Sequence, residues 1–318
     1  MPKLSSKSPD GNMLSAQARM PGARAGRSFQ RFEFVFWLAP ALLLVGALTY
    51  LPILTEVGLS LFVADGFSAP RFVGFANYAQ AAGHPDFWAA LLNNVWYAAG
   101  TVSGKLIFAL IAALLLNGQF RGRTVFRAVF FLPVILSFVA IGLLWTLIFN
   151  YNYGLINFVL QAVGLADLKR DWLGTPETAF PAVIFVDLWK WTGFHVVIYL
   201  AGLQSIPSDL YEAAALDGAS RWQMLRRITI PLLQPFTAIN VVLASLGAFS
   251  VFDLIYVMTQ GGPFKSTNVA MIEVYLQAFQ FNQFGYAAAL SVLLLLLIAG
   301  LSFGLLRIFG SNPVEREI

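Results

Sequence analysis

The stretch at residues 208–231, SDLYEAAALDGASRWQMLRRITIP, lies between two long apolar runs and has the pattern of two short helices joined at a glycine. Ser208 is a suitable N-cap for the first helix. Gly218 suits the left-handed residue that ends that helix, and a capping box that begins at Ser220 starts the second. The pattern therefore predicts a helix pair outside the apolar runs, with Pro231 closing the second helix.

The rest of the chain is apolar enough to place most of it in a lipid bilayer. Of the 318 residues, 58% are hydrophobic and 11% are charged, whereas a soluble domain has about 25% charged residues. The predicted fold class is all-α, a polytopic membrane protein with six transmembrane helices and a cytoplasmic helix pair in the loop at residues 204–234. The six apolar runs that predict these spans lie at residues 34–62, 89–117, 128–149, 178–203, 235–259 and 285–309.

The basic residues indicate the direction of the spans. If the N-terminus is cytoplasmic, fourteen of the 20 Lys and Arg residues fall in inside segments and four in outside segments, as the positive-inside rule requires. Both termini are then cytoplasmic. We expect a basic, disordered tail at residues 1–31, a transmembrane domain at residues 32–310 and a short cytoplasmic tail at residues 311–318. The positive net charge belongs to membrane-protein loops, so no nucleic-acid partner is predicted.

The residue types exclude several kinds of chemistry. Cysteine is absent, and the two histidines, His84 and His195, are far apart in the sequence. The sequence has no phosphate-binding loop and no nucleophile-elbow motif. We therefore predict no catalytic residue, no metal site and no cofactor in this chain.

The helix pair resembles the EAA loop of the permease subunits of ABC importers. The residues that carry the resemblance are Glu212-Ala213-Ala214, then Asp217-Gly218-Ala219, then the ITIP segment at residues 228–231. In that family the loop forms coupling helices that dock into a cleft on a cytoplasmic ATPase subunit. The resemblance implies an ATPase-coupling role for five residues here, Glu212, Ala213, Ala214, Asp217 and Gly218.

Other stretches resemble the carbohydrate branch of these permeases, in particular its maltose-permease-like first subunit. The strongest is FDLIYVMTQGGP at residues 252–263, and a weaker one is FANY at residues 75–78. The resemblance extends from about residue 34 to about residue 309, without the additional N-terminal spans and large periplasmic insertion of the maltose permease itself.

This resemblance implies a type I ABC importer permease fold and a place in the bacterial inner membrane. It also implies a second homologous permease, two ATPase subunits that bind ATP and Mg, and a periplasmic solute-binding protein. The chain would move a sugar or sugar-like solute by alternating access and would itself not be an enzyme.

The fourth run carries the best candidates for solute contact. Asp187 and Lys190 are three residues apart on one helix face, where they either pair with each other or face the solute. Trp191 and Phe194 follow, and a pyranose combines apolar faces that stack on aromatic rings with hydroxyls that bind polar groups. Adding residues from the third and fifth runs, we predict a solute site of Ser137, Phe138, Asp187, Lys190, Trp191, Phe194, Phe249, Ser250 and Asp253.

Other interpretations of the same residues stay open at this stage. The polar groups of the fourth run could serve only helix packing. An ion-coupled secondary transporter would use Asp187 or Asp253 as its proton or sodium site, and a membrane enzyme would need a catalytic cluster. Glu56 and Lys105 are placed near span ends, where their side chains reach the interface. The solute could be a mono-, di- or oligosaccharide, a polyol or glycerol phosphate.

Overall fold

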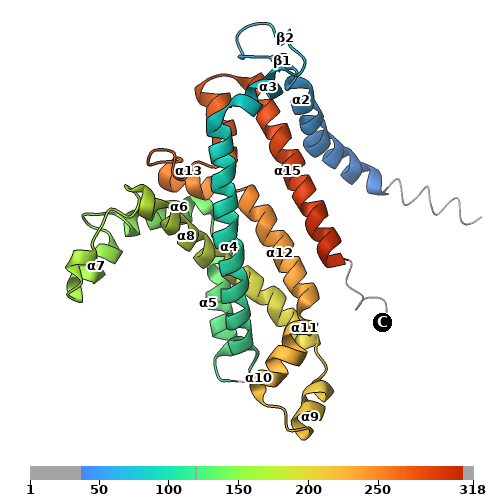
Figure 1. Cartoon of the computed structure of the whole chain (residues 1–318), viewed down its shortest axis with the longest axis vertical. Helices are drawn as coiled ribbons and strands as arrows, with labels where there is room; N and C mark the ends of the chain where they lie inside the picture. The colour runs from blue at the N-terminus through green and yellow to red at the C-terminus, as the bar shows by residue number, and fades with distance from the viewer. Residues whose placement is uncertain (1–36, 119, 311–318) are drawn as a thin grey trace, which may run out of the picture. The chain divides into compact units, whose positions relative to one another are not determined.

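The computed structural model describes residues 37–118 and 120–310, and within these ranges it is mostly helical (Figure 1). The predicted tails, at residues 1–31 and 311–318, lie outside the described residues. The backbone divides into two units, Met1–Thr55 and Glu56–Ile318, which are described separately. Two short strands, β1 (Phe62–Val63) and β2 (Arg71–Phe72), form an antiparallel hairpin in the second unit.

The helices of the described ranges follow one another along the chain with short connections. In order they are α2 (Leu51–Leu59), α3 (Ala76–Gly83), α4 (Pro85–Asn117), α5 (Arg123–Ile135), α6 (Phe138–Ile148), α7 (Leu155–Ala162), η2 (Ala166–Leu168), α8 (Pro176–Ser205), α9 (Ser208–Leu216), α10 (Arg221–Met224), η3 (Leu225–Thr229), α11 (Ile230–Leu232), α12 (Gln234–Phe249), α13 (Asp253–Thr259), α14 (Ala270–Tyr275), η4 (Leu276–Gln280) and α15 (Phe284–Gly310).

Four helices are long and apolar enough to cross a membrane, or up to six if each of two bent helix pairs is one span. The four are Trp37–Leu59, α4, α8 and α15, and they confirm four of the predicted runs as helices. The first contains α2 and the π-helical turn η1 (Gly46–Tyr50), and none of its most apolar window is buried. Residues 34–36 of the first predicted span lie outside the described ranges.

The third predicted run is not one straight helix, because it breaks after α5. Pro133 lies inside α5 and cannot donate a backbone hydrogen bond, and Leu136 and Ser137 are extended. The axes of α5 and α6 differ by 100°. The prediction of a single span at residues 128–149 was therefore wrong about its continuity, and the break places Phe138 at the start of a new helix.

The fifth predicted run is also interrupted. Its helix α12 ends at Phe249, and α13 begins only at Asp253. At its other end α12 follows the segment Arg221–Leu232 with a bend of 61°. The prediction of one continuous helix at residues 235–259 was thus wrong, and so was the prediction that Pro231 ends the second short helix. The π-helical turn η3 shifts the hydrogen-bond ladder before Pro231, so the helix continues through it.

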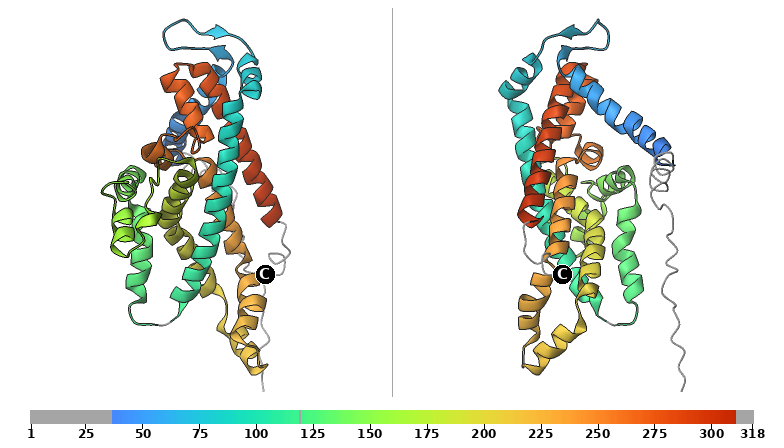
Figure 2. Two further views of the ribbon diagram at one scale, coloured as in Figure 1. Left: turned by 60° about the vertical axis from the view of Figure 1, so that its left-hand side comes forward. Right: turned by 90° about the vertical axis from the view of Figure 1, so that its right-hand side faces the viewer.

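The centre of the second unit is the pair α4 and α8, which lie side by side in Figures 1 and 2. Gly100 and Gly104 of α4 have the small-xxx-small spacing that lets membrane helices approach closely. A β-carbon at Gly104 would lie 2.6 Å from a methyl group of Leu188 on α8, so only glycine fits there without movement. This close packing holds one wall of the cavity described next.

Candidate functional site: a central cavity and a helix hairpin

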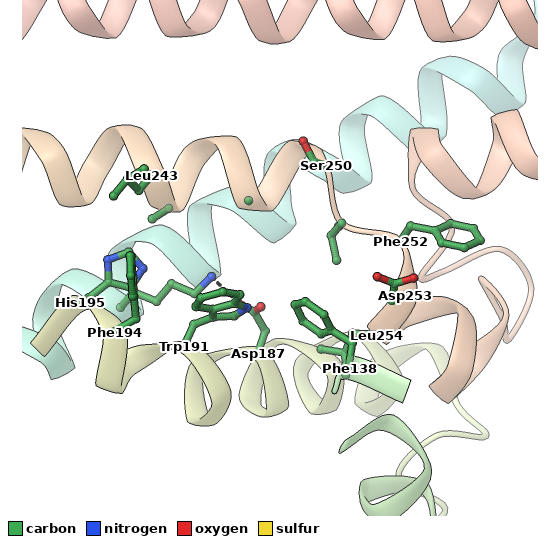
Figure 3. A pocket seen from close by; sticks show the side chains of 14 residues that line it. Phe138, Asp187, Trp191, Phe194, His195, Leu243, Ser250, Phe252, Asp253 and Leu254 are labelled. Carbon is green, nitrogen blue, oxygen red and sulfur yellow. Dashed lines mark ion pairs between the residues drawn. The ribbon is translucent and has the colours of Figure 1, made fainter. Parts of the chain in front are cut away.

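Helix α8 presents one polar and aromatic face to α12. Asp187, Trp191, Phe194 and His195 have the i, i+4, i+7 and i+8 spacing that places residues on one side of a helix. In Figure 3 Asp187, Trp191 and Phe194 project from α8 toward the helix that carries Leu243 and Ser250. This face therefore borders the space between α8 and α12.

A cavity of about 440 Å³ occupies that space. This volume is within the range of about 300–1,000 Å³ that is usual for small-molecule sites. The interruption between α12 and α13 forms part of its wall, which is where non-helical backbone is tolerated at membrane depth. The polar and aromatic groups that line the cavity are Lys105, Phe138, Asp187, Trp191, Phe194, His195, Ser250, Phe252 and Asp253.

The charge in the cavity wall is organised by a buried ion pair. The Nζ atom of Lys105 on α4 lies 2.6 Å from a carboxylate oxygen of Asp187 on α8, and both side chains are almost fully buried. Lys105 thus lies deep in the bundle, and the expectation that it reaches a span end was wrong. His195 is fixed by its Nδ1, which lies 2.8 Å from the Oδ1 of Asn240, so the ring nitrogen donates to the amide oxygen.

Lys190 has a different set of partners. Its ammonium donates to the carbonyls of Pro133, Val134 and Leu136, at 3.2, 3.2 and 2.6 Å. These carbonyls belong to the last turn of α5 and the break after it, where helix-end carbonyls lack their usual intrahelical donors; that of Pro133 also accepts from the amide of Leu136. Lys190 therefore stabilises the break, and the alternative in which it pairs with Asp187 is not the one observed.

Two aromatic rings connect this cation to the cavity. The Nζ atom of Lys190 lies 4.6 Å from the centroid of the Phe138 ring and 5.3 Å from that of Trp191. The two rings are 5.9 Å apart, and Trp191 also makes an edge contact with Phe194. Lys190 and the break thus position the rings that line the cavity.

The structure brings most of the predicted solute residues together. Phe138, Asp187, Trp191, Phe194, Ser250 and Asp253 all line the cavity, whereas Ser137, Lys190 and Phe249 do not. The prediction omitted Lys105, His195 and Phe252. A lysine far from both ends of the second run was the signal that could have identified Lys105 as a cavity residue.

The second candidate site is the hairpin α9–α10, with Glu212, Ala213 and Ala214 on its first helix. Gly218 has a φ of +79°, as the pattern predicted. The amide of Ala219 donates to the carbonyl of Ala214 at 2.9 Å and that of Gly218 to Ala215 at 3.1 Å, which is a Schellman-type helix end that leaves Asp217 at the turn.

The second helix of the hairpin begins with the predicted capping box. The amide of Gln223 donates to Ser220 Oγ at 3.3 Å, and the amide of Ser220 donates to Gln223 Oε1 at 2.7 Å. The predicted N-cap role of Ser208 was wrong, because Pro207 occupies that position and Ser208 is the first residue of α9. A hydrogen bond of 2.9 Å between the hydroxyls of Tyr211 and Thr229 joins α9 to η3, which continues from α10.

The hairpin presents apolar side chains that no described residue covers. Leu216 is 90% exposed and Trp222 is 68% exposed, and Glu212 and Asp217 are exposed beside them. Exposed apolar groups rimmed by charges are typical of a docking surface.

No group of His, Cys, Asp and Glu within the described ranges could hold a metal ion.

Residues 105–309 match the family model of the binding-protein-dependent transport system inner membrane component. The chain belongs to this family. It is therefore a membrane-embedded transport subunit of an ABC importer and not an enzyme, and the expected permease fold is confirmed.

Curated relatives match this permease over most of its length. The probable ABC transporter permease YurN of Bacillus subtilis is 39% identical and covers 88% of this chain and 96% of its own. The trehalose/maltose transport system permease MalF of Thermococcus litoralis is 36% identical over 85% of this chain and 91% of its own.

A solved structure shows the same fold. The match is to a crystal structure of a bacterial ABC transporter that imports the acidic polysaccharide alginate, with a TM-score of 0.77 at 24% identity. It covers 89% of this chain and 98% of the matched chain. At this identity the likeness supports the fold of the permease and not its solute.

Proposed function

We propose that this permease carries a sugar or sugar-like solute across the inner membrane through the cavity between α8 and α12. The observation that carries the proposal is the composition of the cavity wall. Trp191, Phe138 and Phe194 offer aromatic faces, and the Lys105–Asp187 pair, Ser250 and Asp253 offer donors and acceptors. Stacking and hydrogen bonding together suit a pyranose better than they suit an inorganic ion.

The relatives support the same class of solute. The trehalose/maltose permease of Thermococcus litoralis and the lactose permease LacF of Rhizobium radiobacter are each 36% identical to this chain. The net charge that the cavity wall presents does not single out an anionic solute, since Asp187 neutralises Lys105 and Asp253 adds a negative charge. A neutral mono- or oligosaccharide is therefore our first choice, with polyols and glycerol phosphate as the other candidates.

Transport by this chain needs partners. The family description names dependence on a binding protein, and the resemblance to first permease subunits implies a second, homologous permease beside this one. Two ATPase subunits with ATP and Mg would dock on the hairpin α9–α10 through Glu212, Ala213, Ala214, Asp217 and Gly218. Closure of the ATPase dimer would move the hairpin and turn the cavity outward, since ATP binds the two states with different affinity.

The orientation that this mechanism needs has both tails, at residues 1–31 and 311–318, and the hairpin in the cytoplasm. Reporter fusions test it. Fusions after Arg123, Arg227 and Arg307 should give cytoplasmic signals, and fusions near Asp171 and Lys265 should give periplasmic ones. A periplasmic signal at Arg227 would contradict the proposed coupling role of the hairpin.

The experiment for the solute is uptake by the reconstituted complex with its binding protein. Uptake of labelled maltose, trehalose, lactose, glucose and glycerol phosphate would be compared, each with the proton and sodium gradients intact and collapsed. We expect ATP-dependent uptake of at least one sugar. Uptake that needs an ion gradient and proceeds without the ATPase would instead support the ion-coupled alternative, which no feature of the relatives favours.

A further inference from the structure

A groove between α4 and α5 is separate from the solute cavity. It has a volume of about 420 Å³ and lies at the end of the second unit where these two helices are joined. Its walls are apolar and largely exposed, and Leu115 is 71% exposed. The side chains that define it are Phe108, Ile111, Leu115, Phe126, Phe130 and Thr192.

Three arginines lie close together in the sequence at the end of the groove where α4 and α5 are joined. Phe120 and Phe126, with ring centroids 5.9 Å apart, close the end of the groove. Arg121 lies in the turn between the helices, Arg123 is the first residue of α5, and Arg127 lies one helical turn further along α5. The apolar groove thus lies next to a segment of the chain that carries three positive charges.

These arginines have no counter-ion within the described residues. The sequence contains no Asp or Glu between Asp86 and Asp167, and these arginines take no part in the ion pairs of the described residues, Lys105–Asp187 and Lys265–Asp86. Arg127 donates from Nη2 to the carbonyl of Leu116 at 3.0 Å, but its buried Nε has no hydrogen-bond partner in the described part of the chain. The positive charge of these three arginines is therefore not balanced by an ion pair within the described residues.

We propose that this groove binds an anionic phospholipid, with an acyl chain between α4 and α5 and the phosphate among Arg121, Arg123 and Arg127. An amphiphile fits both features at once, and basic pockets between transmembrane helices bind anionic headgroups. Because the family is an inner-membrane family, phospholipid surrounds the chain. The assignment of the site to the cytoplasmic leaflet rests on the proposed orientation. The turn lies at the same end of the second unit as α9 and α10 (Figures 1 and 2).

Photo-crosslinking of the complete complex in lipid vesicles tests the site. The probes are phosphatidylglycerol and phosphatidylcholine that carry the same photoreactive acyl chain, present in both leaflets. We expect adducts on residues 108–116 and 126–130, at a yield roughly tenfold higher with phosphatidylglycerol. The Arg121→Gln/Arg123→Gln variant should remove that preference, whereas Lys169→Gln/Arg170→Gln, with the same charge loss elsewhere, should keep it.

A second variant pair tests the groove itself. Ile111→Trp fills the groove and should lower the adduct yield severalfold, whereas Ile107→Trp, on an equally exposed position of α4 outside it, should not. Equal yields from the two lipids, or a preference that survives loss of both arginines, would overturn the proposal. So would adducts in the isolated chain that vanish in the complex, because a partner protein then covers the groove. None of these readouts depends on solute uptake.

Discussion

The buried ion pair between Lys105 and Asp187 makes the sharpest quantitative prediction, because the same chain contains an exposed pair of equal length. Lys265 and Asp86 also lie 2.6 Å apart, but their side chains are 57% and 42% exposed, against 4% and 5% for Lys105 and Asp187. Distance is thereby held constant and only burial differs. The comparison isolates the effect of taking charges out of water.

Removing one partner of a buried pair leaves an uncompensated charge and costs about 3–5 kcal/mol, whereas an exposed pair is worth about 0–1 kcal/mol. We expect Lys105→Met or Asp187→Asn alone to lower the stability of the chain strongly. The double variant should recover most of the loss, since no lone charge remains. Lys265→Met should have little effect.

The assay is thermal unfolding of the purified chain in detergent, followed by the fluorescence of its 8 tryptophans. The expected rank of unfolding midpoints is wild type and Lys265→Met highest, the Lys105/Asp187 double variant next, and the two single variants lowest. A double variant that loses as much as the two single variants together would refute the reasoning, because the two side chains would then act independently.

Three further changes test other parts of the account. Gly218→Val should abolish co-purification of the ATPase, since a φ of +79° costs a side chain about 1–2 kcal/mol and disfavours β-branched residues most, whereas Gly218→Asn should retain the ATPase; equal retention in both would argue against the hairpin. Trp191→Ala should change which sugar is taken up with the complex intact. Lys190→Met should lower the unfolding midpoint, because three carbonyls lose their hydrogen bonds to the ammonium, and normal stability of this variant would argue against a positioning role for Lys190. Gly104→Leu should separate α4 from α8 and reduce the folded yield in membranes, and a normal yield would show that the two helices pack less closely than described.

The hairpin and most spans could be predicted from the sequence because their signals are local. Capping at Ser220 and the left-handed Gly218 depend on neighbours a few residues away, and the apolar runs depend only on length. The N-cap prediction at Ser208 was wrong by one residue, because α9 begins at Ser208 and Pro207 occupies the N-cap position without a capping hydrogen bond. Local patterns of this kind are therefore reliable to within a residue or two.

The cavity could be predicted only in part. Its α8 face follows from helical spacing, but the partner of Asp187 lies 82 positions earlier in the chain, beyond any i, i+3 rule. The break after α5 was missed for a related reason. Pro133 weakens the helix, yet the sharp bend persists because Lys190 from another helix satisfies the freed carbonyls. Contacts between distant segments decided both features.

Protection of a single cysteine by solute tests the central claim most directly. The chain has no natural cysteine, so Ser250→Cys places one reporter in the cavity wall. Ser68→Cys places a control in the exposed loop between β1 and β2. Alkylation would be followed in the transporting complex with and without the sugar that it takes up. We expect the transported sugar to slow alkylation at position 250 severalfold and to leave position 68 unchanged. An unchanged rate at position 250, in a complex that still transports the sugar, would contradict a solute path through this cavity.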